Sequence, residues 1–379
     1  MPRMITVVGA GLAGVRTAER LRKRGYDGRL VLIGAERHPP YDRPPLSKQV
    51  LRGERDEPWL RPKNDYADLG VELVLGEAAS ALDPRQRIVF VKNEAIEYDT
   101  LIIATGARPR RLPGLDGHVL RAWGDAEQLR ARLSPGVRLA VVGAGLIGCE
   151  VAASARSLGV DVTLIDALAG PLIRAVGPDV SSVVADLQTG HGVELRLGTT
   201  ATRASRDRLV LGDGSEVIAD VVLEAIGVEP EVEWLAGSGI TVDGGVVCDA
   251  DGRTSADGVF AVGDVAQWDG IRFEHWASAV EQADRVAATV LGDSAPQRSL
   301  PYWWSDQYDV KIQGIGACLD TDDVTMLAWG PKQRTLALYS RHSRLTGAVG
   351  FSAAAAVMGL RPDVAAGTEL PEVLRRLAT

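Results

Sequence analysis

A glycine-rich turn occurs twice in this chain, each time directly after a short run of aliphatic and β-branched residues. The first copy is MITVVGAGLAG, which begins at residue 4, and the second is LAVVGAGLIG, which begins at residue 139. A helical pattern follows each turn, so both copies predict a strand, a tight turn and a helix. In a chain of 379 residues, this repetition predicts an α/β fold with two doubly wound domains.

The glycines of each copy have the spacing of a dinucleotide-binding turn. In the first copy, Gly9 permits the turn, Gly11 lets the backbone approach a pyrophosphate, and Gly14 lets the helix pack closely on the strand. The second copy repeats this spacing with Gly143, Gly145 and Gly148. The N–H groups at each helix start, together with the helix dipole, are then expected to attract phosphates.

An acidic residue follows each turn at the distance expected of a ribose-binding carboxylate. Glu36 lies 22 residues after Gly14, and Asp166 lies 18 residues after Gly148. Such a carboxylate repels a 2′-phosphate, so Asp166 favours NAD over NADP, although Arg174 lies only eight residues further on. Two complete copies predict two Rossmann-like dinucleotide-binding domains, and a chain that holds two dinucleotides is expected to pass electrons between them.

The segment YDRPPLSKQVLRG, residues 41–53, places two prolines before a serine and a lysine. Ser47 is expected to cap a helix, with Lys48 in the first turn, where a cation opposes the helix dipole. Residues that break a local rule often lie at functional sites. Lys48 and Arg43 are therefore candidates to contact phosphate or a reduced, negatively charged ring; a pair of surface side chains is the alternative.

Three further segments bear on the site. EYDTLIIATGARPR predicts a buried strand that ends at Thr105 and Gly106, where the chain can cross to the next domain. TSADGVFAVGDVA predicts another strand that ends in Gly263 and Asp264, an acid that suits ribityl or diphosphate-side hydroxyls or else a plain turn. PYWWSDQY concentrates aromatic residues, which form a small core or, for Trp304, a platform over a flavin ring.

Composition excludes several classes of function. With 46% apolar and 24% charged residues the chain is expected to be globular, and its longest apolar run, AVGFSAAAAVMGL, is too short to cross a bilayer. The three cysteines and five histidines are widely spaced, which predicts no metal site and a reduced, cytoplasmic protein. The net charge of the chain is −8, yet residues 1–63 hold 14 Lys and Arg against 7 Asp and Glu. This basic segment indicates either a solvated surface or a docking face for an acidic partner. It does not have the pattern of a nucleic-acid binder.

The chain resembles the FAD-dependent, NADH-using ferredoxin reductases of oxygenase systems, the group that includes putidaredoxin, rubredoxin and biphenyl dioxygenase reductases. The resemblance extends from residue 4 to about residue 350. It is carried by VVGAGLAG, PYDRPPLSK, ATGARPR, VVGAGLIGCE, FAVGDVA, EHWASAVEQA and WSDQYD.

The resemblance implies which residues bind each cofactor. FAD would be held by Gly9, Gly11, Gly14, Glu36, Arg43, Lys48, Arg121, Asp264 and Trp276. NAD(H) would be held by Gly143, Gly145, Gly148 and Asp166. Glu150 matches a family glutamate near the nicotinamide, so the resemblance implies an ion pair between Lys48 and Glu150 beside the flavin, and Trp304 matches an aromatic residue packed by the ring. Lys48, Glu150 and Trp304 are the residues expected to act in catalysis.

The resemblance also implies the domain organisation. An FAD domain in two pieces, residues 1–106 and 233–300, would enclose an NAD domain, residues 107–232, and a small α+β C-terminal domain would occupy residues 301–379. The family's GxxPN motif here is GVEPE, with Glu231 in place of asparagine, and its EHWxNA motif has Ser278. The C-terminal segment is short and ends in an alanine-rich tail, which is expected to affect partner binding more than cofactor binding.

The implied function is transfer of a hydride from NADH to FAD, followed by release of single electrons to a [2Fe–2S] ferredoxin, with no membrane or nucleic-acid partner and a monomer or homodimer as the assembly. Basic side chains are expected to dock this acidic carrier, namely Arg43, Lys311, Lys332, Arg334 and Arg341. Alternatives are a flavoenzyme acting directly on a small molecule, an NADH sensor similar to apoptosis-inducing factor, and a thiol-based reductase. The last needs a redox cysteine in the N-terminal domain, whereas the first cysteine is Cys149.

Overall fold

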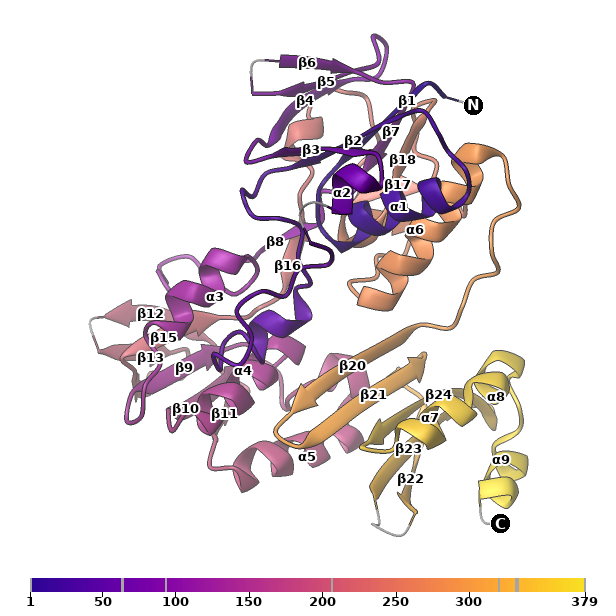
Figure 1. Ribbon diagram of the computed structural model, residues 1–379. Coiled ribbons are helices and arrows are strands. Elements are labelled where there is room, and N and C mark those ends of the chain that lie inside the picture. Colours follow the sequence, from indigo (N-terminus) through magenta and orange to yellow (C-terminus); the bar gives the residue numbers. More distant parts are fainter. Residues whose placement is uncertain are drawn as a thin grey trace. The chain divides into compact units, whose positions relative to one another are not determined.

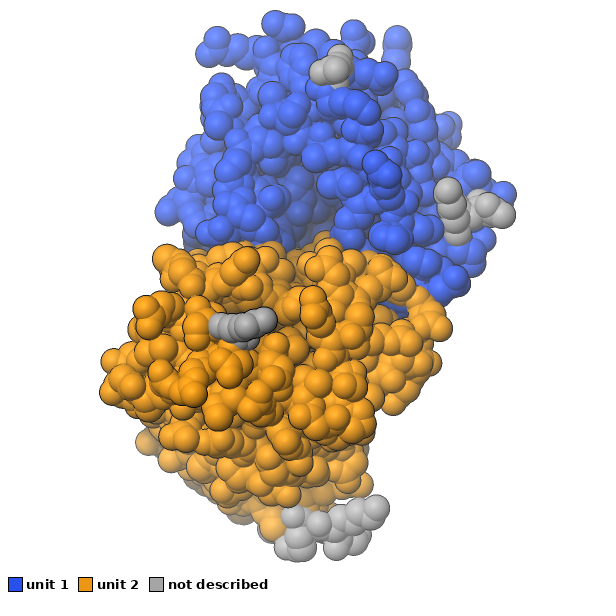
Figure 2. All heavy atoms as spheres, turned by 90° about the vertical axis from the view of Figure 1, so that its left-hand side faces the viewer, with its two compact units in different colours: residues 1–42, 57–108, 228–299 blue, residues 43–56, 109–227, 300–379 orange. Residues whose placement is uncertain are grey.

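The computed structural model describes residues 2–62, 65–92, 94–205, 207–319, 321–330 and 334–377. By its internal contacts the chain divides into two compact units, drawn in separate colours in Figure 2. Unit 1 comprises Met1–Asp42, Glu57–Arg108 and Val228–Ser299, and unit 2 comprises Arg43–Asp56, Pro109–Gly227 and Leu300–Thr379. The segments predicted as an NAD domain and a C-terminal domain therefore fall mostly within one unit. The assignment of a cofactor to each segment stays a prediction.

A five-stranded parallel sheet forms the centre of unit 1, with the strand order β18-β7-β1-β2-β3 (Figure 1). Its strands are β1 (Met4–Val8), β2 (Arg29–Gly34), β3 (Val71–Leu75), β7 (Thr100–Ile103) and β18 (Val259–Ala261). Consecutive residues of β2, β7 and β18 are buried, which explains why these strands are apolar along their length. Helices α1 (Leu12–Lys23) and α6 (Trp276–Leu291) pack against each other and share the core of this sheet.

The other elements of unit 1 are short. An antiparallel sheet consists of β4 (Ala79–Asp83), β5 (Ile88–Val91) and β6 (Glu94–Glu97), and β17 (Val246–Cys248) pairs in parallel with β19 (Ala266–Trp268). β8 (Ala107–Pro109) pairs with β16 (Val228–Pro230). The helical elements are α2 (Asp65–Asp68) and the 3₁₀ turns η2 (Glu233–Leu235) and η3 (Gly263–Val265).

Glu231, the departure from the family's asparagine, has a clear partner. The guanidinium of Arg108 in β8 donates to the carboxylates of Glu229, Glu231 and Glu233, of which the first two contacts measure 2.9 and 3.1 Å. The hydrogen bond from Arg108 lowers the pKa of Glu233 to about 2. The acidic residue at position 231 is therefore accommodated as part of a surface ion-pair cluster.

A second parallel sheet, in the order β11-β10-β9-β15, lies in unit 2. Its strands are β9 (Arg138–Val142), β10 (Asp161–Asp166), β11 (Glu194–Leu197) and β15 (Val221–Glu224). The helices of this part are α3 (Trp123–Arg130), α4 (Leu146–Ser157) and α5 (Ile173–Gly190), and the 3₁₀ turn η1 (Pro44–Ser47) belongs to the same unit. An antiparallel sheet of β12 (Ala201–Ser205), β13 (Arg208–Leu211) and β14 (Glu216–Ile218) completes it.

The C-terminal part of unit 2 is an antiparallel sheet with the order β20-β21-β24-β23-β22. Its strands are β20 (Tyr302–Gln307), β21 (Val310–Gly316), β22 (Asp323–Trp329), β23 (Arg334–Arg341) and β24 (Arg344–Phe351), followed by α7 (Ala354–Gly359), α8 (Arg361–Ala366) and α9 (Leu370–Leu377). The alanine-rich tail forms these three helices, which pack on the sheet through an apolar cluster. The longest apolar run is divided between β24 and α7, and none of the helices in the described part of the chain is long and apolar enough to span a bilayer.

In both parallel sheets the strand order reverses beside the strand that precedes a glycine turn. β2 and β3 lie on one side of β1, and β7 and β18 lie on the other; β10 and β11 lie on one side of β9, and β15 lies on the other. Ligands of open α/β sheets bind at the carboxyl ends of the strands at such a reversal. Each unit therefore presents its glycine turn where the topology favours a ligand.

Candidate functional site

The first glycine turn joins β1 to α1 in unit 1. Gly9 has a φ of 117°, and a Cβ atom there would lie 2.0 Å from the carbonyl oxygen of Ala104. A Cβ on Gly14 would lie 1.9 Å from the carbonyl oxygen of Gly9, so the helix packs on the turn with no room for a side chain. A Cβ on Gly11, in contrast, would meet no atom within 4 Å. Gly11 is the N-cap of α1 without a side-chain cap hydrogen bond, so its backbone borders open space at the positive end of a helix.

The second glycine turn joins β9 to α4 and repeats this geometry in unit 2. Gly143 has a φ of 109°, and a Cβ there would lie 2.3 Å from the carbonyl oxygen of Ala225. A Cβ on Gly148 would lie 1.9 Å from the carbonyl oxygen of Gly143, whereas one on Gly145 would meet nothing within 4 Å. Gly145 is the N-cap of α4 and again lacks a side-chain cap. Both turns therefore fit a dinucleotide, because each leaves a helix start accessible to a pyrophosphate.

Of the two acids predicted to bind a ribose, Glu36 follows β2 and Asp166 is the last residue of β10. In unit 1, Glu36 is half-buried and accepts a hydrogen bond of 2.6 Å from the hydroxyl of Tyr41. In unit 2, the carboxylate of Asp166 accepts hydrogen bonds from the N–H groups of Ala144, at 2.6 Å, and Leu168, at 2.8 Å. Asp166 is thus fixed directly against the second glycine turn, where its charge lies beside any nucleotide held there.

Two further residues that the resemblance assigns to FAD lie in unit 1. Trp276 begins α6, is half-buried, and donates a hydrogen bond of 2.9 Å from Nε1 to the carboxylate of Asp42. Asp264 is a half-buried residue of η3, directly after Gly263, which has a φ of 76°. Both side chains belong to the unit that carries the first turn.

Lys48 lies in a different local structure from the one the sequence predicts. The segment forms the 3₁₀ turn η1, which ends at Ser47, so Ser47 is not a helix cap and Lys48 follows the turn instead of beginning a helix. Proline at the start of η1 suits a short turn with a fixed φ. The ammonium of Lys48, which is 5% exposed, donates to the carbonyl oxygen of Pro44 at 3.0 Å and to the carboxylate of Glu150 at 2.5 Å. The alternative of a surface side chain is therefore wrong for Lys48.

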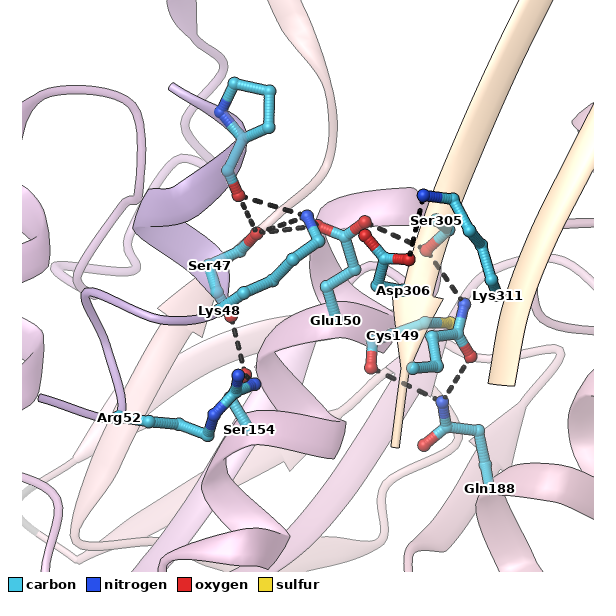
Figure 3. Close-up of polar contacts among 12 residues, drawn as sticks. Ser47, Lys48, Arg52, Cys149, Glu150, Ser154, Gln188, Ser305, Asp306 and Lys311 are labelled. Atoms are coloured by element: carbon cyan, nitrogen blue, oxygen red, sulfur yellow. Dashed lines mark hydrogen bonds and ion pairs between the residues drawn. The ribbon is translucent and has the colours of Figure 1, made fainter. Parts of the chain in front are cut away.

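Glu150 is a buried carboxylate on α4, 3% exposed, with partners on both oxygen atoms (Figure 3). Its Oε2 atom accepts from Lys48 and from the hydroxyl of Ser47 at 2.6 Å, and its Oε1 atom accepts from the hydroxyl of Ser305 at 2.9 Å. The ion pair that the resemblance implies is present. A buried pair is stable only with such additional hydrogen bonds, because both charges have lost their water.

Sequence reasoning missed Ser47, Ser154 and Ser305 as partners in this site. Ser154 lies four residues after Glu150, on the same face of α4, and its hydroxyl donates to the carbonyl oxygen of Ser47 at 2.7 Å. Ser305 shares the buried face of β20 with Trp303 and Gln307. The helical and strand periodicities could have placed these side chains on the correct faces, although not opposite Glu150.

The remaining predicted residues of unit 2 are placed as follows. Trp304 is half-buried on the face of β20 opposite Trp303, and its ring stacks on that of Tyr302 with a centroid distance of 5.9 Å. Trp303 lies in the core, as expected for most of these aromatic residues. Arg43 is half-buried and directly precedes η1. Arg121 is also half-buried, and its backbone N–H group donates to the carboxylate of Asp125.

All three cysteines lie where burial disfavours a thiolate. Cys149, Cys248 and Cys318 are all free. Cys149 is fully buried beside Glu150, and burial raises the pKa of its thiol. Burial likewise raises the pKa values of Cys248 and Cys318 to about 12. None of the three is poised as a thiolate nucleophile.

The basic residues predicted for docking have varied surroundings. The ammonium of Lys311 lies 3.7 Å from the carboxylate of Asp306, and the guanidinium of Arg341 donates to the buried carboxylate of Asp322 at 2.7 Å. Arg334 is exposed at the start of β23, and Lys332 lies outside the described residues. Several arginines of the basic N-terminal segment form surface ion pairs, namely Arg16, Arg24, Arg29 and Arg61.

Known proteins match both parts of the chain. A family model described as pyridine nucleotide-disulphide oxidoreductase matches residues 3–283, and one described as reductase C-terminal matches residues 302–375. The benzene 1,2-dioxygenase system ferredoxin–NAD(+) reductase subunit of Pseudomonas putida is 39% identical over 332 residues, which cover 83% of this chain and 81% of that protein.

Solved structures match the fold over nearly the whole chain. The crystal structure of a covalent putidaredoxin reductase–putidaredoxin complex has a TM-score of 0.92 and 30% identity, and the match covers 98% of this chain and 95% of that chain. The crystal structure of a protein named Fdr9 has a TM-score of 0.89 and 41% identity, and the match covers 97% of this chain and 96% of that chain. Both matches therefore extend over nearly the whole length of a solved relative.

Proposed function

This chain belongs to the pyridine nucleotide-disulphide oxidoreductase family, and we propose that within it the protein acts as an FAD-containing, NADH-dependent ferredoxin reductase. The observation that carries the proposal is the glycine turn found once in each unit, each at a strand-order reversal and each open at its middle glycine. Relatives named as ferredoxin–NAD(+) reductases support the choice of electron acceptor. The disulphide chemistry in the family's name has no support in this chain, because its three cysteines are unpaired.

The backbone and acidic residues are assigned to cofactor binding within each unit. In unit 1, the turn of Gly9, Gly11 and Gly14 would hold FAD, with Glu36, Asp264 and Trp276 as further binding residues. In unit 2, the turn of Gly143, Gly145 and Gly148 would hold NAD(H). Asp166 accepts hydrogen bonds from the adenosine ribose and disfavours a 2′-phosphate, which makes NADH the preferred reductant.

A bound flavin would supply the redox chemistry, namely the acceptance of a hydride from NADH and the release of single electrons. The protein supplies position and charge. Glu150 lies on the helix that begins at the second glycine turn, which supports a role for the Lys48–Glu150 pair beside the proposed NAD(H) site. Lys48 would stabilise the negative charge that the acceptor gains during hydride transfer. The carbonyl oxygen of Pro44 and the carboxylate of Glu150 hold its ammonium in place.

The unpaired cysteines also support a reducing, cytoplasmic location. Secreted proteins tend to oxidise their cysteines to disulfides, whereas Cys149 and Cys248 are buried and Cys318 is half-buried, all as free thiols.

Electron transfer to a carrier tests the proposed function directly. Cytochrome c reduction by NADH is measured with the purified flavoprotein alone and after addition of a [2Fe–2S] ferredoxin. The rate is expected to rise many-fold with the ferredoxin and to fall with ionic strength, because oppositely charged surfaces associate more slowly in salt. A rate that is independent of the ferredoxin, combined with a long-lived reduced flavin, would contradict the proposal and indicate an NADH sensor.

A further inference from the structure

A chain of hydrogen bonds inside unit 2 connects Glu150 to a residue near the surface. The hydroxyl of Ser305 contacts Oε1 of Glu150 at 2.9 Å, and the amide nitrogen of Gln307 contacts that hydroxyl at 3.2 Å. The amide of Gln188 contacts the amide oxygen of Gln307 at 2.9 Å, and the hydroxyl of Tyr308 contacts Gln188 at 2.9 Å. The chain thus joins α4, β20 and α5 through side chains alone.

The inner members of this chain have no access to water. Ser305, Gln307 and Gln188 are 0% exposed. A buried amide is stable only when its donors and acceptor are satisfied, so these three residues depend on one another for hydrogen bonds. Figure 3 shows Gln188, Ser305 and Glu150 from this part of the unit. Three uncharged polar side chains in a core call for an explanation beyond packing.

The direction of every hydrogen bond follows from the chemistry of the two ends. An ionised Glu150 only accepts, so Ser305 must donate its one proton to it, and Ser305 must then accept from the amide group of Gln307. At the other end, the amide nitrogen of Gln188 contacts the carbonyl oxygen of Cys149 at 3.3 Å. A carbonyl also only accepts, so the amide oxygen of Gln188 is turned toward Tyr308, whose hydroxyl must donate. All donors therefore point toward Glu150.

We propose that Ser305, Gln307 and Gln188 are positioning residues that polarise the Glu150 carboxylate through this one-directional chain. Hydrogen bonds aligned in series strengthen one another, so the donors of this chain stabilise negative charge on Oε1. They thereby oppose the pull of Lys48 and Ser47 on the other oxygen, Oε2, and Lys48 is less completely neutralised than it would be by a carboxylate without the chain. The link to hydride transfer rests on the proposed function, whereas the effect on the carboxylate does not.

Tyr308 is suited to be the first donor of the chain. Burial raises the pKa of its phenol, so the hydroxyl keeps its proton over the physiological range. Its ring stacks on that of His191 with a centroid distance of 3.6 Å and an interplanar angle of 10°, which restrains its orientation. The half-buried position of Tyr308 makes it the member that is easiest to alter without disturbing the core.

Infrared spectroscopy of the oxidised holoenzyme tests the effect on the carboxylate. The protein is labelled with carbon-13 at the glutamate carboxyl groups, and the Glu150 stretching band is identified as the one lost in Glu150→Gln. Ser305→Ala and Tyr308→Phe are expected to shift this band in the same direction, with the larger shift for Ser305→Ala, and Ser305→Thr is expected to retain the wild-type position. An unshifted band in Ser305→Ala and in Tyr308→Phe would overturn the proposal, because side chains that only fill the core would not alter the carboxylate.

Stopped-flow reduction by NADH separates this proposal from the assigned role of the ion pair. Ser305→Ala is expected to slow flavin reduction at saturating NADH by about tenfold, the effect of losing one hydrogen bond to a charged group, with little change in NADH affinity. Ser305→Thr should restore the rate. If the infrared band shifts while the rate stays unchanged, the hydrogen-bond chain is supported and the role of Lys48 and Glu150 in hydride transfer is contradicted.

Discussion

The ammonium of Lys48 lies 2.5 Å from a carboxylate oxygen of Glu150, although 102 residues separate the two in the sequence. Both side chains are almost fully buried. Burial makes the pair sensitive to the loss of either partner, since the remaining charge would have no compensation in a medium of low dielectric constant. The contact therefore predicts both a stability effect and a kinetic effect.

Replacing Lys48 by methionine is expected to lower the free energy of unfolding of unit 2 by about 3–5 kcal/mol, because it leaves Glu150 buried and unpaired. The double variant Lys48→Met/Glu150→Gln should regain much of this loss, as it removes both charges. Chemical denaturation monitored by tryptophan fluorescence measures the difference. In the same variants, anaerobic reduction of the flavin by NADH should be slowed more than FAD retention is weakened.

Lys311 provides the matched control, since its ammonium lies 3.7 Å from Asp306 and its side chain is about half exposed. Lys311→Met should lower the free energy of unfolding by at most about 1 kcal/mol, as is usual for the loss of a surface ion pair. Equal effects of the two lysine substitutions, or a wild-type rate of flavin reduction in Lys48→Met, would contradict the role assigned to Lys48.

The middle glycines of the two turns are expected to separate cofactor binding from folding. A Cβ on Gly11 or Gly145 would meet no protein atom within 4 Å but would project at a helix start. Gly145→Ala should therefore leave stability near wild type while raising the Kd for NADH by about tenfold or more, a loss of ~1.4 kcal/mol. Gly11→Ala should weaken FAD retention instead. Calorimetric titration with NADH and the flavin content after gel filtration measure the two effects.

The outer glycines serve as the comparison. A Cβ on Gly14 or Gly148 would lie 1.9 Å from a backbone carbonyl oxygen, so alanine at either position should destabilise the fold by about 1–3 kcal/mol or more. If Gly145→Ala instead unfolded the protein and Gly148→Ala left it stable, the assignment of these glycines would be wrong.

Much of this fold could be predicted because its signals are local. The run RLVLIG is the whole of β2, and the spacing of three glycines after β1 and β9 is enough to predict both turns. The helix predicted after Ser47 is wrong because a tertiary contact decides the local structure: η1 ends at Ser47, whose hydroxyl bonds Glu150, 103 residues away. No periodicity connects Ser305 to Glu150 either, since the two lie 155 residues apart on a strand and a helix.

Cys149 is expected to be dispensable for turnover. Its thiol is fully buried, burial raises its pKa, and its Sγ atom donates a weak hydrogen bond to the carbonyl oxygen of Ala144, at 3.4 Å. Cys149→Ala should retain NADH-dependent electron transfer at close to the wild-type rate, with a loss of about 1 kcal/mol in stability from the smaller side chain. Steady-state assays of the variant check this. Complete loss of turnover in a folded variant would indicate thiol chemistry.

Two histidines are expected to make the protein less stable in mild acid. Burial lowers the pKa of His275, the N-cap of α6, and burial together with Arg132 and Arg111 lowers that of His118. Above the unfolded-state pKa of about 6.5 both residues are neutral in either state; as the pH falls through this value the unfolded chain binds protons first, so stability decreases.

Replacing His275 by asparagine should reduce this pH dependence, because asparagine is uncharged throughout and is a favourable N-cap. Urea denaturation of both proteins at about pH 7.5 and about pH 5.5 measures the change. The wild-type protein should lose more stability between the two pH values than the variant. Parallel losses would show that His275 does not contribute.

An anaerobic titration with NADH, followed by visible absorption, tests the central claim that the two glycine turns hold a flavin and its reductant. The purified protein is expected to be yellow, to lose its visible band as one equivalent of NADH is added, and to recover the band when an oxidised [2Fe–2S] ferredoxin follows. A colourless protein that binds no added FAD, or a bound flavin that NADH leaves oxidised, would contradict the account.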